Sequence, residues 1–168
     1  MKLEKITLDY VAAEDRILVR TQAHNGEVVS FWLTLRMSRA LVKFLLEHLD
    51  KVTPVSAAAD RELMQTFKQT SALMQLEPGT AVESGDAMPL LLTTLDLQRK
   101  PNGVVLQLPL RDGTAADLAM DSVQLRQYLH ILRNMFVRAE WPLDGWPAWM
   151  NEAAADVASA ERDARPLH

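Results

Sequence analysis

Two aspartates occupy nearly the same sequence setting. Asp9 lies in the tetrapeptide TLDY at 7–10, and Asp96 lies in TLDL at 94–97. If the chain repeats one structural unit about a pseudo-twofold axis, the two carboxylates could approach each other. Such an approach would raise the pKa of one carboxyl and suit acid–base chemistry or cation binding. The alternative is a structural role, in which each aspartate ends its strand and orders the following turn.

Other catalytic and metal-binding signatures are missing from the sequence. The chain has no cysteine, which excludes disulfides, thiol nucleophiles and cysteine-rich metal sites. It has no glycine-rich nucleotide loop, zinc-protease motif or nucleophile elbow. The histidines are too scattered to predict a metal site; they are His24, His48, His130 and His168. We therefore predict no metal and no cofactor, and an enzyme using the two aspartates is only a third hypothesis.

Charge and hydropathy limit the partners. The net charge of -4 gives no global attraction to nucleic acid or anionic lipid. Charged residues are scattered through residues 1–16, where a signal peptide would need an apolar run, and no later span is long enough to cross a bilayer. We expect a cytoplasmic protein without a membrane partner.

An offset of 87 positions carries one half of the chain onto the other. It places the Asn-Gly dipeptide at 25–26 on the Asp-Gly dipeptide at 112–113, and both are typical of type I′ hairpins. It also places Thr34 on Asp121, two residues that favour a helix N-cap. Each half therefore predicts three strands followed by a capped helix. The alternative is two unrelated meanders that share common hairpin chemistry.

The alternation of side chains agrees between the halves, because successive residues of a strand face opposite sides of the sheet. The first strands are predicted to turn Ile6, Leu8 and Tyr10 inward in one half and Thr93, Leu95 and Leu97 in the other. The inward sets of the second and third strands are Ile17, Val19, Thr21, Val29, Phe31 and Leu33 in the first half and Val104, Leu106, Leu108, Ala116, Leu118 and Met120 in the second. An error of one residue in the register would exchange the inward and outward sets.

The sequence thus predicts an α+β protein made of two tandem βββα units. Amphipathic helices from Leu35 and from Ser122 are expected to cover the inward strand faces, and the more polar side of the second helix carries Arg126 and His130. The expected segments are a first unit at 1–52, a linker helix at 53–77, a loop at 78–89, a second unit at 90–140 and a tryptophan-rich tail at 141–168.

The linker helix has no counterpart in the second half. Thr53 and Pro54 have the chemistry of an N-cap and a first turn. An apolar stripe at helical spacing follows, formed by Val55, Ala59, Leu63, Phe67, Thr70 and Met74.

The tail has too much apolar side-chain area to remain fully exposed to solvent. Its large side chains are those of Trp141, Trp146, Trp149 and Met150. We expect these side chains to pack against another surface. One possibility is the chain's own outward sheet face, which bears Leu18, Val28 and Trp32. The other is a second subunit, with these four residues at the interface of a homodimer.

Two surfaces are candidates for binding nucleic acid or an acidic partner. The outward sheet face offers Arg20 and Trp32, and the first helix has a basic edge formed by Arg36, Arg39 and Lys43. The layout of tandem sheet-plus-helix repeats resembles the Pur-alpha and Whirly architectures, whose sheets bind single strands through basic and aromatic side chains. The chain contains no motif of those families. The leading hypothesis is therefore a non-enzymatic interaction module that forms a homodimer, and the alternative is a single-stranded nucleic-acid-binding protein.

Overall fold

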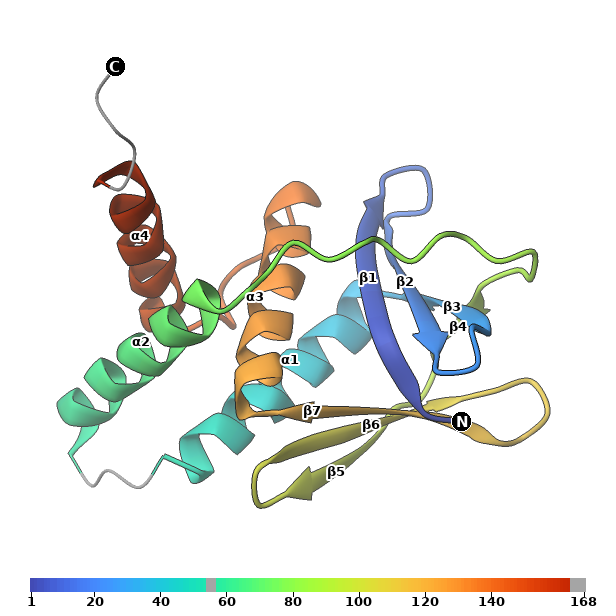
Figure 1. The fold of residues 1–168 in the computed structure, drawn as a ribbon, viewed down its shortest axis with the longest axis horizontal. Coiled ribbons are helices and arrows are strands. Elements are labelled where there is room, and N and C mark those ends of the chain that lie inside the picture. The colour runs from blue at the N-terminus through green and yellow to red at the C-terminus, as the bar shows by residue number, and fades with distance from the viewer. Residues whose placement is uncertain (54–56, 164–168) are drawn as a thin grey trace.

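The structure, a computed structural model, describes residues 1–53 and 57–163 (Figure 1). It confirms an α+β protein with strands β1–β3 followed by a helix. The predictions made for Pro54, Val55 and His168 lie outside the described residues. The elements are β1 (Leu3–Val11), β2 (Arg16–Ala23), β3 (Val28–Leu33), α1 (Leu35–Lys51), α2 (Ala58–Met74), β4 (Leu90–Leu91), β5 (Asp96–Lys100), β6 (Gly103–Pro109), β7 (Ala115–Asp121), α3 (Ser122–Arg138) and α4 (Ala148–Asp163).

The described strands form two sheets that share one apolar core. One sheet has the order β1-β2-β3-β4 and the other β5-β6-β7. They meet where Lys2 bridges Asp117, whose N–H donates to the Met1 carbonyl oxygen at 2.7 Å. Leu45 of α1 and Leu129 of α3 are fully buried in a core cluster that includes strand residues from both sheets. Figure 1 shows α1 and α3 beside the sheets, with α2 and α4 on the far side of α3.

The predicted alternation in the second and third strands is confirmed. Every member of both inward sets is buried except Val29, which is half-buried. All six residue pairs between β2 and β3 recur between β6 and β7 at the offset of 87. Ile17 pairs with Leu33 in one half, and Val104 pairs with Met120 in the other. An internal duplication is consistent with this register and stays a prediction.

The first strands do not follow the same offset. Asp9 lies opposite Leu18, whereas Asp96 lies opposite Gln107, so the second copy is displaced by two residues. The cause is turn length: four residues, 12–15, connect β1 to β2, but only 101–102 separate the paired ends of β5 and β6. A displacement of two preserves which face each side chain takes. Leu97 accordingly packs against the core. Leu95 and Thr93 precede β5: Leu95 also packs against the core, but the prediction that Thr93 faces inward is wrong, because the strand begins only at Asp96 and Thr93 is exposed.

The two hairpin turns are not type I′, which would require positive φ at both central residues. Only the glycines adopt it, with φ of 85° at Gly26 and 82° at Gly113. Gly26 N–H donates to the Ala23 carbonyl and Ala23 N–H donates to Glu27, the pattern of a three-residue loop closed by a glycine bulge. The prediction was wrong because Asn25 contributes its side chain instead: its Oδ1 accepts the Glu27 N–H at 3.1 Å.

Both predicted helix caps that follow a third strand are confirmed. Thr34 accepts from the Met37 N–H, and Asp121 forms a capping box with Gln124. The predicted cap of the linker helix is wrong. Thr53 turns its hydroxyl back to the Leu49 carbonyl at 2.8 Å, and α2 has Ala57 at its N-cap without a side-chain bond.

The short strand β4 was not predicted. Leu90 lies opposite Phe31 and Leu91 opposite Trp32, so β4 extends the first sheet in parallel with β3. The segment expected to begin the second unit at residue 90 therefore starts by completing the first sheet.

Candidate interaction surfaces

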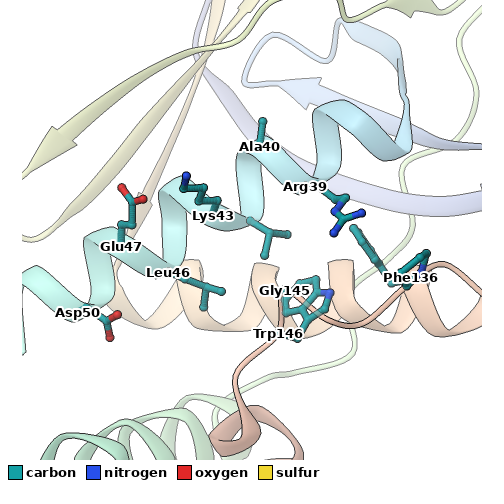
Figure 2. Close-up of a pocket in the computed structure, with 11 residues that line it drawn as sticks. Arg39, Ala40, Lys43, Leu46, Glu47, Asp50, Phe136, Gly145 and Trp146 are labelled. Carbon is teal, nitrogen blue, oxygen red and sulfur yellow. The ribbon is translucent and has the colours of Figure 1, made fainter. Parts of the chain in front are cut away.

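The basic edge of α1 borders a groove of about 450 Å³ (Figure 2). Phe136 of α3 and Trp146 of the segment before α4 line it together with α1. Arg39 donates to Asp144 at 2.7 Å and so bridges α1 to that segment. Lys43 makes no hydrogen bond or ion pair within the described part of the chain. The structure thus brings Arg39 and Lys43 together with Trp146.

The remaining charges of this edge are either paired or outside the groove. Glu47 lies 3.4 Å from Arg99, a cation that also covers the Phe44 ring. Arg36 is exposed and borders a separate open depression beside Arg16. Of the three cations of the basic edge, Arg39 is compensated within the chain, while Lys43 and Arg36 are exposed and could contact a phosphate backbone.

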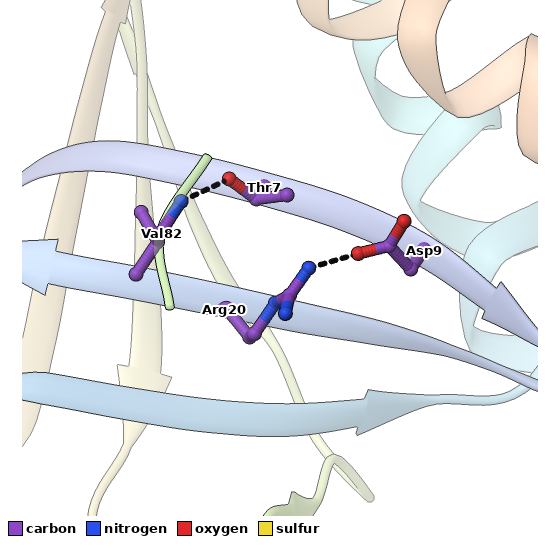
Figure 3. A network of polar contacts seen from close by, with 4 residues as sticks. All are labelled: Thr7, Asp9, Arg20 and Val82. Atoms are coloured by element: carbon purple, nitrogen blue, oxygen red, sulfur yellow. Dashed lines mark hydrogen bonds and ion pairs between the residues drawn. The ribbon is translucent and has the colours of Figure 1, made fainter. Parts of the chain in front are cut away.

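The outward sheet face is partly covered by the chain itself. Arg20 donates to Asp9 of the neighbouring strand, and Trp32 is half-buried. The segment between α2 and β4 crosses this face, where the Val82 N–H donates to the Thr7 hydroxyl at 2.8 Å (Figure 3). Val82 is only 3% exposed. The predicted loop, rather than the tryptophan-rich tail, covers the sheet and reduces the open platform that a single strand would need.

The structure does not bring the two aspartates together. Asp9 belongs to the four-stranded sheet and is held by Arg20, while Asp96 is exposed at the start of β5 in the other sheet. No hydrogen bond or ion pair between them is found among residues 1–53 and 57–163. The acid–base hypothesis has no geometric support here.

The tryptophan-rich tail covers its own chain on the helical side. Trp141 packs edge-on against Tyr10 and Phe136, with ring centroids 5.9 Å and 5.2 Å apart. Its indole N–H donates to Asp15 at 3.0 Å. Asp15 also accepts the Tyr10 hydroxyl, which raises the pKa of Tyr10. Trp149 and Met150 are buried in the core, and Trp146 is half-buried. These residues have little area left for a second subunit.

The three histidines within the described residues, His24, His48 and His130, lie in different settings. No group of three histidine or carboxylate side chains that could hold a metal occurs in the described residues. His24 is exposed beside Glu4, as expected for a loop residue. His48 is buried and His130 is half-buried, and burial lowers the pKa of both.

The orientation of α2 was not predicted. The helix buries Gln65 and Gln69, at 1% and 0% exposure. It leaves Leu63, Phe67 and Met74 exposed at 71%, 69% and 62%. We call Leu63, Phe67, Thr70 and Met74 the α2 stripe. An apolar stripe normally faces the core, so this helix is inverted.

A buried polar network explains the inversion. Arg126 of α3 was predicted on the helix's polar side but is only 3% exposed. Its guanidinium donates to the side-chain and main-chain oxygens of Gln65, and Gln69 donates to the Arg126 carbonyl at 3.0 Å. Gln65 also donates to Asp50 at 3.1 Å, and Arg126 lies over the Trp149 ring. The two glutamines, four residues apart and opposite the stripe, were the missed sequence signal.

The burial of Arg126 has an electrostatic consequence. Desolvation lowers the pKa of its guanidinium to about 10, and the carboxylate of Asp50 opposes that shift. The buried guanidinium therefore remains charged near neutral pH, and its hydrogen bonds go to the neutral residue Gln65.

No family model, curated protein or solved structure matches the chain. Function must therefore be inferred from the surfaces themselves. None of the described helices has the length and hydropathy that a bilayer span requires. The α2 stripe and the groove beside α1 both combine exposure with apolar side chains.

Proposed function

We propose that the chain is a non-enzymatic interaction module that forms a homodimer through the α2 stripe. The observation that supports this proposal is the exposure of Leu63, Phe67 and Met74 on one face of one helix. Contiguous exposed apolar side chains are typical of protein interfaces. The groove beside α1 is a weaker candidate, because two of its charged side chains, Arg39 and Glu47, are already paired within the chain.

The spacing of the stripe favours a helix as its partner. Positions 63, 67, 70 and 74 follow the four-three-four spacing of a coiled-coil seam. In an antiparallel pair, Leu63 of one copy would lie opposite Met74 of the other, and Phe67 opposite Thr70. The contact is then the same on both chains, as a twofold axis requires.

The flanks of the stripe are compatible with self-association. Met64 and Ser71 border it on one side and Thr66 on the other. In an antiparallel pair, equivalent flanks face each other, so charged residues at these positions would oppose like charges. These flanking residues of α2 are uncharged, and the charge nearest to them is Glu152 of α4, which accepts from the Thr66 hydroxyl at 3.1 Å.

The test is the light-scattering mass after size exclusion. We expect the wild-type chain to have twice its 18.9 kDa mass at low and at high salt, since an apolar contact is insensitive to screening. The double variant Leu63→Ser, Phe67→Ser should elute with the mass of one chain. Val137→Ser is the matched control, because Val137 is 50% exposed on α3 outside the stripe.

Two outcomes would contradict the proposal. One is a monomeric wild-type chain, and the other is a dimer that the double variant leaves intact. A monomer that binds a mixed single-stranded oligonucleotide only at low salt would instead favour the nucleic-acid alternative and direct attention to Arg20, Trp32 and the basic edge of α1.

A further inference from the structure

A pocket of about 340 Å³ lies where the end of α1, the middle of α2, the start of α3 and the β5–β6 turn meet. Val52, Phe67 and Val123 give it apolar walls. Its polar lining comes from Lys68 and Arg126 together with hydroxyl and amide side chains, and includes no aspartate or glutamate. Pockets of this size with apolar walls and a few polar groups are typical of small-molecule sites.

The charge of the pocket is positive and incompletely balanced. Arg126 is buried, and its guanidinium hydrogen bonds go to the neutral Gln65. The carboxylate of Asp50 acts on Arg126, but the two are joined by hydrogen bonds only through the Gln65 amide. Lys68 makes no hydrogen bond or ion pair with any described residue. A buried cation without a directly paired anion is costly, so an anion in this pocket would be stabilising.

The hydroxyl groups of the pocket provide uncharged donors. Ser71 accepts from the Gln75 side chain at 3.4 Å, which leaves its own hydrogen available. Ser122 makes only a long bond of 3.5 Å to the Asn102 carbonyl. Both hydroxyls line the same pocket as Lys68.

We propose that this pocket binds a small organic carboxylate with an apolar body. Lys68 forms the direct ion pair, because its ammonium group has no partner among the described residues, whereas Arg126 is only 3% exposed and already donates to Gln65. Arg126 contributes its charge from within the protein, and the hydroxyls of Ser71 and Ser122 donate to the carboxylate oxygens. The apolar body lies against Val52 and Val123, which are outside the α2 stripe. An inorganic anion would leave those walls uncovered.

The first test uses three probes on the full chain. Phenylacetate carries both features, phenylacetamide lacks the charge, and inorganic phosphate lacks the apolar body. We expect saturable shifts of the Ser122 and Val123 amide resonances with phenylacetate and affinities at least about tenfold weaker for the other two probes. Equal binding of phenylacetamide, equal binding of phosphate, or no saturation by about 10 mM phenylacetate would overturn the proposal.

Variants identify the site. Lys68→Met should weaken phenylacetate binding about tenfold, because the direct ion pair is lost. Lys43→Met is the matched control, since Lys43 is an exposed helical lysine that lines the other groove. Equal weakening by both lysine variants would overturn the assignment. Leu63→Ser does not alter the pocket lining and should retain binding, so failure of the dimer and failure of the ligand site are separate results.

Discussion

Helices α1 and α2 each have 17 residues, but they bury opposite kinds of face: α1 buries its apolar face and α2 buries a polar one. α1 turns its leucines inward, with Leu45 and Leu49 fully buried, and leaves Lys43 in solvent. α2 turns Gln65 inward and leaves Phe67 in solvent. An apolar stripe therefore identifies a helix but does not by itself determine which face meets the protein.

The neighbours of each helix account for the difference. α1 directly follows β3 and buries its apolar face in the core shared by the sheets, so hydrophobic burial determines its position. α2 packs against α3 and α4, and its inner neighbour is the buried cation of Arg126. Gln65 on the inner face of α2 accepts from that cation, and Gln69 beside it donates to the Arg126 main-chain carbonyl. The apolar stripe then lies outside, where we propose that a second copy covers it.

The largest expected contrast is between two leucines. Leu45→Ala should lower the free energy of unfolding by about 2–5 kcal/mol, because it removes a fully buried side chain and leaves a cavity. Leu63→Ala should change it by less than about 0.5 kcal/mol, because Leu63 is exposed. Urea unfolding at a concentration where the chain is monomeric measures both. A large loss from Leu63→Ala in the monomer would show that α2 is oriented differently.

The buried network should give the next largest effect. Gln65→Ala removes the side-chain oxygen that accepts from Arg126, leaves the main-chain acceptor in place, and should cost about 1–3 kcal/mol in urea unfolding. Replacing both partners, as Arg126→Met with Gln65→Leu, should recover much of that loss, because no buried charge is then left unpaired. A double variant as unstable as the sum of the single variants would indicate that the network does not act as a unit.

Much of the sheet and of the first and third helices could be predicted from the sequence. Alternation fixed the inward faces of β2, β3, β6 and β7, and Thr34 and Asp121 marked where their helices begin. These features depend on the local chemistry of helix caps and on the spacing of apolar residues, both of which can be read directly from a single sequence.

The features that the sequence did not reveal depend on distant contacts. The close approach of β6 to β7 depends on Gly103, where an added Cβ would lie 2.0 Å from the Met120 carbonyl oxygen. The burial of Arg126 depends on Gln65, 61 residues away. The covering of the first sheet depends on the contact between Val82 and Thr7. A single sequence does not show that two such residues, far apart along the chain, are in contact.

Acid should lower the stability of the fold through one histidine on α1 and one on α3; α2 has no histidine. Burial lowers the folded-state pKa of His48 and of His130 below the ordinary 6.5. Stability is therefore complete above the unfolded pKa and decreases as pH falls through it, because the unfolded chain binds protons more readily. Urea midpoints measured from about pH 8 to about pH 5 should decline. His48→Gln should reduce that decline, because it removes one of the two histidines whose pKa burial lowers.

The smallest expected effect comes from the exposed ion pair that links α1 to the segment before α4. Arg39 and Asp144 lie 2.7 Å apart, but both side chains are about half exposed. A double-mutant cycle of Arg39→Met and Asp144→Asn should give a coupling of only about 0.2–1 kcal/mol, and added salt should weaken it. The buried contact of Arg126 with Gln65 should show a larger coupling that salt barely changes, because water does not screen it. Equal couplings would mean that the network under α2 is open to solvent, and that the polar contacts do not hold the helix in its inverted orientation.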